Sequence, residues 1–125
     1  MNVLVLEDEA YRQKLFRRAL IGTACEIVST AGECIRLLSE KNWDFLFLDH
    51  DLDMQQMVPS GPGTGYEVAC WLEANPERKP DNVVIHSLNN VGGPRMAQAI
   101  PGAVWLPGCW GTIEVQDGGL LVRGH

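Results

Sequence analysis

A short apolar run that stops abruptly in charged residues constrains this 125-residue chain more than any other stretch. Residues 45–48 read FLFL, which is too short for a buried helix and is typical of a strand buried on both faces of a parallel sheet. The next five residues read DHDLD. Open α/β sheets bind their ligands at this carboxyl end of the strands. We therefore expect the functional site to begin at Asp49, His50 and Asp51, and we expect Asp53 on the loop surface.

Two further strands are expected to end in the same way. Residues 2–6 (NVLVL) and 82–85 (NVVI) are apolar runs of strand length, and each is followed at once by polar side chains. Because parallel strands end at one edge of a sheet, these groups are expected near Asp49. They are Glu7, Asp8 and Glu9 after the first strand, and His86, Ser87, Asn89 and Asn90 after the other.

Helical patterns separate the expected strands. Apolar residues at helical spacing predict helices over 10–21 and 65–75, and Thr30 and Thr64, each followed three residues later by a glutamate, predict helix starts. Gly92, Gly93 and Pro94 introduce a last short helix that ends near residue 100. Further strands are expected at 24–29 and 103–106, a long loop at 54–63, and a β-hairpin around residues 117–119. The chain is therefore predicted to have an α/β fold.

Composition and charge narrow the kind of ligand. A net charge of -6 argues against an extended nucleic-acid surface or an anionic membrane as partner. The four cysteines have no close spacing, so neither a disulfide framework nor a zinc site is predicted. No basic leader and no apolar run of membrane-spanning length is present, so we expect a cytoplasmic protein. The expected ligand is a small phosphate-containing molecule, and a homodimer is left open.

The order of these elements resembles the receiver domain of bacterial response regulators, a flavodoxin-like fold, over about residues 1–107. In that family an acidic pair after the first strand and an aspartate after the third hold Mg²⁺, and the aspartate accepts a phosphoryl group. Glu7, Asp8 and Asp49 match these positions, and Ser87 matches the family's hydroxyl residue. The family's lysine, just before a proline after the fifth strand, is replaced by Leu106.

The segments LDHDL, GTGYEVA and VIHSLN are similar to a divergent group called cyclic-phosphate processing receiver domains. This resemblance implies a receiver fold adapted to phosphoester chemistry. We expect a single domain over residues 1–125: a five-stranded parallel sheet with helices on both faces over 1–107, and a hairpin extension at 108–125 in place of the last helix.

Carboxylates from adjacent strand ends suit Mg²⁺ or Mn²⁺, which prefer oxygen ligands. We expect Glu7, Asp8 and Asp49 to bind such an ion, with Asp51 as a further direct or indirect ligand. The alternative is that the acidic side chains only cap neighbouring helices.

His50 and His86 are expected to act as general acid and base beside Asp49, because neutral-range imidazoles exchange protons readily. Each histidine alone is equally compatible with a buried structural role. Ser87, Asn89 and Arg95 are candidates for binding phosphate oxygens, although the segment around Gly92 is also typical of plain turn chemistry.

These residues lead to two hypotheses. The first is a metal-dependent phosphoesterase that opens a cyclic phosphodiester, either of a cyclic nucleotide or of a 2′,3′-cyclic phosphate end, with water attacking phosphorus. The second is a non-catalytic receiver-like module that binds a nucleotide or a protein partner. The missing lysine argues against ordinary phosphorelay signalling, because no cation remains at that position to pair with an acyl phosphate.

Overall fold

The computed structural model describes residues 1–52 and 59–123. Asp53, His125 and most of the expected loop at 54–63 therefore lie outside the described residues. The strands are β1 (Asn2–Leu6), β2 (Ala24–Val28), β3 (Phe45–Leu48), β4 (Asn82–Ile85), β5 (Val104–Trp105), β6 (Ile113–Gln116) and β7 (Gly119–Val122). The helices are α1 (Ala10–Ala19), α2 (Ala31–Glu40), α3 (Gly65–Ala74) and α4 (Gly92–Ala99), with short 3₁₀ turns η1 (Pro76–Arg78) and η2 (Cys109–Gly111).

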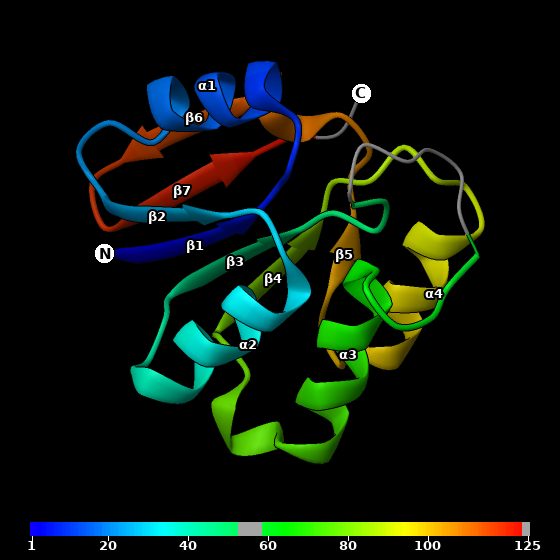
Figure 1. Cartoon of the computed structure of the whole chain (residues 1–125). Coiled ribbons are helices and arrows are strands. Elements are labelled where there is room, and N and C mark those ends of the chain that lie inside the picture. The colour runs from blue at the N-terminus through cyan, green and yellow to red at the C-terminus, as the bar shows by residue number, and fades with distance from the viewer. Residues whose placement is uncertain (53–58, 124–125) are drawn as a thin grey trace.

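The first five strands form one parallel sheet in the order β2-β1-β3-β4-β5 (Figure 1). The order reverses direction between β1 and β3, which is the switch point where a flavodoxin-like sheet opens a crevice at its carboxyl edge. The strands next to this switch, β1, β3 and β4, are the three that the sequence analysis placed before polar residues. The predicted flavodoxin-like receiver fold is therefore confirmed.

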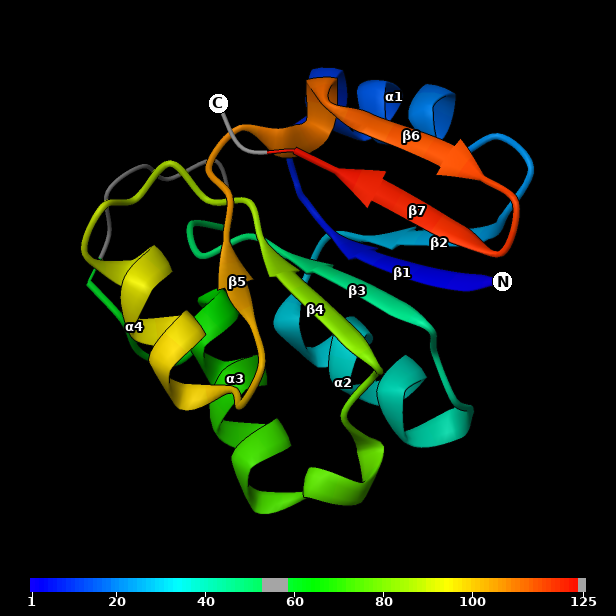
Figure 2. The same ribbon diagram turned by 180° about the vertical axis from the view of Figure 1, so that it is seen from behind.

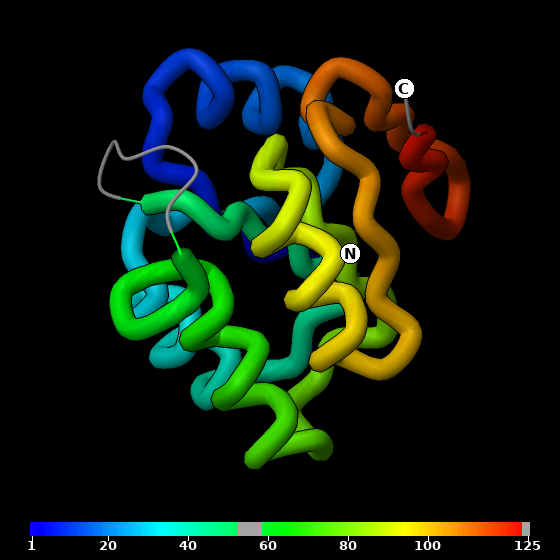
Figure 3. Tube along the Cα trace, turned by 90° about the vertical axis from the view of Figure 1, so that its right-hand side faces the viewer, coloured from blue at the N-terminus to red at the C-terminus, as the bar shows by residue number. Residues whose placement is uncertain are grey.

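Helices and the hairpin cover the two faces of the sheet (Figures 1 and 3). Because side chains alternate along a strand, Leu46 and Leu48 pack with α2, α3 and α4, whereas Phe47 packs with Phe16 of α1. None of these core side chains is more than a few per cent exposed. The sheet thus has an α2–α3–α4 face and an α1 face, and these two names are used below.

The C-terminal segment forms the expected antiparallel hairpin instead of a last helix (Figure 2). Gln116 pairs with Gly119, and Gly118 between them has a φ of 79°, a left-handed conformation that favours glycine. The side chains of Ile113, Leu120 and Val122 pack against the core of the α1 face. The hairpin therefore completes, together with α1, the cover of this face.

Side chains at the helix starts explain where the helices begin. The Thr30 hydroxyl accepts a hydrogen bond from the Glu33 backbone N–H at 3.1 Å, as the capping pattern predicts. Glu9 caps α1 by accepting from the backbone N–H groups of residues 11 and 12. The first helix is shorter than the predicted 10–21, because Leu20 leaves the helical conformation and Gly22 follows with a φ of 98°. Within the described residues, no helix is long and apolar enough to cross a membrane.

Candidate metal and phosphate site

The hydrogen bonds of the parallel sheet continue one residue beyond β1, β3 and β4. They bring the three polar residues that follow these strands next to one another. The backbone N–H groups of Glu7, Asp49 and His86 donate to the carbonyls of Val28, Leu6 and Leu48, at 3.0, 3.1 and 2.9 Å. These bonds prolong the parallel pairing at the carboxyl edge. Glu7, Asp49 and His86 therefore emerge side by side from β1, β3 and β4.

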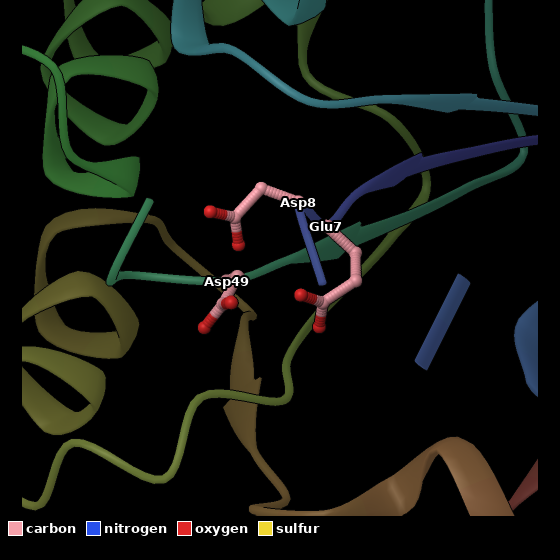
Figure 4. A group of neighbouring side chains, drawn as sticks. All are labelled: Glu7, Asp8 and Asp49. Atoms are coloured by element: carbon pink, nitrogen blue, oxygen red, sulfur yellow. The ribbon is translucent and has the colours of Figure 1, made fainter. Parts of the chain in front are cut away.

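Three carboxyl groups lie together at this edge, as predicted (Figure 4). Glu7, Asp8 and Asp49 each offer an oxygen within 4.8 Å of the others, and we call them the acidic cluster. Glu7 is fully buried and Asp49 is 2% exposed, whereas Asp8 is half-buried. Carboxylates so close together and so poorly hydrated repel one another strongly.

Burial shifts the protonation of this cluster. Loss of hydration, followed by the charge of Asp49, raises the pKa of Glu7 to about 8. Burial likewise raises the pKa of Asp49 above its usual range. The Arg12 guanidinium lies 3.9 Å from Glu7 Oε1 and offsets only part of the negative charge. A divalent cation would offset the remainder.

The donor set of the acidic cluster fits Mg²⁺ or Mn²⁺. All three side chains offer hard carboxylate oxygens, and Glu7 Oε1 is buried without any hydrogen-bond partner. A buried polar atom without a partner is destabilising, and a cation bound by the acidic cluster would supply a partner for Glu7 Oε1.

His86 lies on the α1 face next to Glu7. Its Nε2–H donates to the Leu6 carbonyl at 3.3 Å, and its Nδ1 lies 3.7 Å from Glu7 Oε1 without a hydrogen-bond partner. The His86 ring packs in T-shaped arrangements with the rings of Phe16 and Trp110. Complete burial lowers the pKa of His86 to about 3, so the ring is neutral and cannot serve as a general acid near pH 7.

His50 faces the opposite side of the sheet edge. Its ring is fully buried against Gly92 of α4, whose Cβ, if added, would lie 2.4 Å from a ring carbon. Since α4 packs on the α2–α3–α4 face and Phe16 on the α1 face, the two imidazoles do not share a pocket. The contacts of the two rings therefore do not support the expectation that His50 and His86 act as an acid–base pair around one phosphorus.

In the described part of the chain, Asp51 is not one of the three residues whose carboxylate oxygens gather within 4.8 Å, although, after burial, its charge helps to raise the pKa of Asp49. Asp51 Oδ1 accepts hydrogen bonds from His50 Nδ1 at 2.8 Å and from Asn89 Nδ2 at 3.0 Å. This oxygen is committed to the imidazole and the amide. Asp51 is therefore a partner of His50, and its role as a direct or indirect metal ligand stays a prediction.

The three residues expected to bind phosphate differ in their surroundings. Ser87 and Asn89 are buried, and the Ser87 hydroxyl accepts from the Asn89 backbone N–H at 3.0 Å. Asn89 Oδ1 accepts from the backbone N–H groups of Val91 and Gly92 at the start of α4. These bonds give both side chains a role in positioning α4. Arg95 is exposed on α4 and keeps its charge accessible.

Sequence reasoning missed two contributors to this region. Ser60, in the segment before α3, contacts His50 Nε2 at 2.9 Å, and no local pattern relates two side chains ten residues apart. Gly92 was interpreted as turn chemistry, yet it is required because the His50 ring leaves no room for a side chain. Its neighbour Gly93 is similarly crowded by Trp105. The adjacent glycines were the available signal for close packing.

Solved structures of receiver domains share the fold of this chain. A CheY-like receiver domain from Methylobacillus flagellatus superposes with a TM-score of 0.64 at 19% identity, covering 86% of this chain and 85% of that one. The Mn(2+)-bound form of response regulator Rcp1 gives 0.61 at 18% identity, with 85% and 79% covered. A CheY-like receiver domain from Methanospirillum hungatei gives 0.56 at 20% identity, with 85% and 81% covered. No curated protein matches the chain.

A family model identifies the chain more specifically than its fold does. The model is described as the cyclic-phosphate processing receiver domain, and it matches residues 2–101, which include the acidic cluster and both buried histidines. The match spans most of the chain and agrees with the parallel sheet and the clustered carboxylates at its edge. This chain belongs to the family of cyclic-phosphate processing receiver domains.

Proposed function

We propose that this protein is a metal-dependent phosphoesterase that opens cyclic phosphodiesters at the acidic cluster. The observation that carries the proposal is the set of three carboxylates within 4.8 Å of one another, with Glu7 Oε1 buried and without a hydrogen-bond partner. Such a set could hold a divalent cation, and Mg²⁺ commonly binds phosphate oxygens together with one or two carboxylates.

The family's name provides the substrate class, since the chain matches the model of receiver domains that process cyclic phosphates. The residue before Pro107 argues against phosphorelay signalling, because it is a leucine where the receiver family has a lysine. Leu106 there packs against the core of the α1 face, so this position supplies no cation to pair with an acyl phosphate on Asp49.

When bound, the cation would polarise the phosphoryl oxygens and stabilise the charge that develops on them. Glu7, Asp8 and Asp49 would hold it at the sheet edge. His86 is fixed in one tautomer by the bond from its Nε2–H to the Leu6 carbonyl, which leaves Nδ1 as a hydrogen-bond acceptor beside Glu7. Exposed Arg95 supplies a positive charge for the anionic substrate.

The experiment is a turnover assay with purified protein. Cyclic mononucleotides, cyclic dinucleotides and 2′,3′-cyclic ends are incubated with Mg²⁺, Mn²⁺ or EDTA, and the products are followed by phosphorus NMR. Ring opening that requires the cation is expected, and Asp49→Asn should abolish it. Asp81→Asn is the matched control, because Asp81 is exposed and precedes β4, at the opposite edge of the sheet.

Absence of turnover from every substrate contradicts the proposed activity. Cation-dependent binding of a nucleotide without turnover would instead support a non-catalytic receiver-like module. Turnover that persists unchanged in Asp49→Asn would move the reaction away from the acidic cluster.

A further inference from the structure

Outside the acidic cluster, three side chains form a continuous hydrogen-bonded chain. Asp51 Oδ1 lies 2.8 Å from His50 Nδ1, and His50 Nε2 lies 2.9 Å from Ser60 Oγ. The two nitrogens of one imidazole thus join a carboxylate to a hydroxyl. This is the arrangement by which a histidine removes the proton of a serine during nucleophilic attack.

The hydrogen bonds define which ring nitrogen carries the proton. An ionised carboxylate only accepts, so the short contact with Asp51 places the proton on His50 Nδ1. His50 Nε2 then presents its lone pair, and the Ser60 hydroxyl donates to it. Asn89 Nδ2 donates to Asp51 Oδ1 at 3.0 Å, and it also lies 3.3 Å from His50 Nδ1. The shorter Asp51–His50 contact of 2.8 Å is the one that assigns the Nδ1 proton.

The imidazole is held rigidly, whereas the serine residue is partly exposed. The His50 ring is fully buried, and a Cβ at Gly92 would lie within 2.4–2.6 Å of three of its atoms. The Gly65 backbone N–H donates to the His50 carbonyl at 2.8 Å and fixes the backbone as well. Ser60, in contrast, is partly exposed. A fully buried imidazole is therefore hydrogen-bonded to the hydroxyl of a partly exposed serine.

A positive charge lies on the same part of the molecule. Arg95 follows Gly92 by three residues in α4, so both lie on one side of the helix. The Arg95 guanidinium carbon lies 5.9 Å from the ring centre of Tyr66, near the start of α3. This charge favours an anionic electrophile over a neutral ester.

We propose that Ser60 is a nucleophile activated by His50 and Asp51, and that it attacks the phosphorus of a cyclic phosphodiester. The choice of phosphorus rests on the proposed function, whereas the activated hydroxyl rests on the hydrogen-bonded chain alone. Ser60 Oγ forms a bond to phosphorus, one ring ester bond breaks, and the serine proton passes through His50 Nε2 to the departing alkoxide oxygen. No atom is lost, so the adduct has the mass of the protein plus that of the intact cyclic substrate.

A fluorophosphonate tests the activated serine without any cation. Its attack by Ser60 forms a phosphorus–oxygen bond and releases fluoride, with the serine proton leaving as hydrogen fluoride. The full chain is incubated with the reagent in EDTA, and the modified residue is mapped by mass spectrometry. We expect a single adduct on Ser60, lost in Ser60→Ala, while Asp51→Asn and His50→Gln slow labelling about 100-fold or more.

Ser39→Ala is the matched control, because Ser39 is exposed and its hydroxyl donates to the Arg36 carbonyl instead of to a histidine. It should leave labelling of Ser60 unchanged. Thermal unfolding of each variant shows whether it is folded, and Asp51→Asn, which keeps the size of the side chain, preserves the test if His50→Gln does not fold. No adduct on Ser60, or equally fast labelling of Ser60 in Asp51→Asn, would overturn the inference.

The labelling of Ser60 and the turnover of cyclic phosphodiesters can fail independently of each other. Labelling of Ser60 without turnover of any cyclic phosphodiester would contradict the phosphoesterase while the activated serine stands. Full turnover by Ser60→Ala would contradict the role of Ser60 while the phosphoesterase stands. An adduct of substrate mass on Ser60, trapped by acid quenching, would support both.

Discussion

Replacing Glu7 by glutamine should stabilise the metal-free protein. Glu7 Oε1 and His86 Nδ1 lie 3.7 Å apart, are buried, and have no hydrogen-bond partner. Both atoms are acceptors when the carboxylate is ionised and the imidazole is neutral. In Glu7→Gln the amide N–H can donate to His86 Nδ1, while the amide oxygen keeps the hydrogen bond that Glu7 Oε2 accepts from the Glu9 backbone N–H at 3.0 Å.

The raised pKa of Glu7 gives this effect its pH dependence. The usual value is 4.5 and the folded value is about 8, so between these pH values the folded chain binds more protons than the unfolded chain. Stability of the metal-free protein therefore falls as the pH rises from 4.5 through 8. Leaving a buried polar group unsatisfied costs about 1–3 kcal/mol. We expect Glu7→Gln to gain about 2 kcal/mol at pH 8, or roughly 8 °C in Tm for a chain of this size, and much less at pH 5.

Thermal unfolding in EDTA and in Mg²⁺ or Mn²⁺ measures both parts of this prediction. The cation should raise the Tm of the native protein, because it binds the folded state alone, and it should raise that of Glu7→Gln much less. Glu114→Gln, at an exposed position of β6, is the matched control and should change neither value. A metal-free Glu7→Gln that melts below the native protein at pH 8, or that responds fully to the cation, would refute the reasoning.

Three further predictions concern the packing around the site. In Gly65→Ala the new Cβ would lie 1.7 Å from the Asp49 carbonyl oxygen, so we expect a loss of about 3 kcal/mol or more in urea unfolding, whereas Gly61→Ala, with nothing within 4 Å, should change little. Phe16→Ala should lose about 3–5 kcal/mol by the same measurement, because the ring is fully buried and contacts His86 at 4.9 Å between centroids. The pKa of His86 is lowered from 6.5 to about 3, so between these pH values the unfolded chain binds one more proton at this histidine than the folded chain does. The stability that comes from the neutral, buried His86 is therefore complete above pH 6.5 and is lost as the pH falls toward 3. Relative to the native protein, His86→Phe should therefore lack a slope of about 1.4 kcal/mol per pH unit between pH 6 and 4, measured by urea titrations; an identical pH profile would contradict this.

The arrangement of elements could be predicted because short local patterns determine it. The apolar run at 45–48, the capping residue Thr30 and the glycine turn at residue 118 each indicate their own structure without knowledge of the rest of the chain. The edge of the sheet where polar groups gather follows from the parallel order of the strands. Those rules were sufficient to bring Glu7, Asp8 and Asp49 together.

The directions of the side chains needed one more step. Consecutive side chains at the end of a strand point to opposite faces of the sheet, so His50 lies on the other face from Asp49. His86 follows β4 at the same level as Asp49. The alternation alone therefore argued against one pocket shared by His50 and His86. Partners from distant segments carry no such signal. The contact of Ser60 with His50 depends on the path of the segment before α3, and the neutral state of His86 depends on complete burial by Phe16 and its neighbours.

The most direct test is the position of Mn²⁺ in crystals of the native protein, located by its anomalous scattering. We expect one strong peak at about 2.0–2.3 Å from carboxylate oxygens of Glu7, Asp8 or Asp49, and no peak there in crystals of Asp49→Asn. Full occupancy of Mn²⁺ elsewhere on the chain, with none at these carboxylates, would contradict a cation site at the edge of the sheet and with it the proposed phosphoesterase.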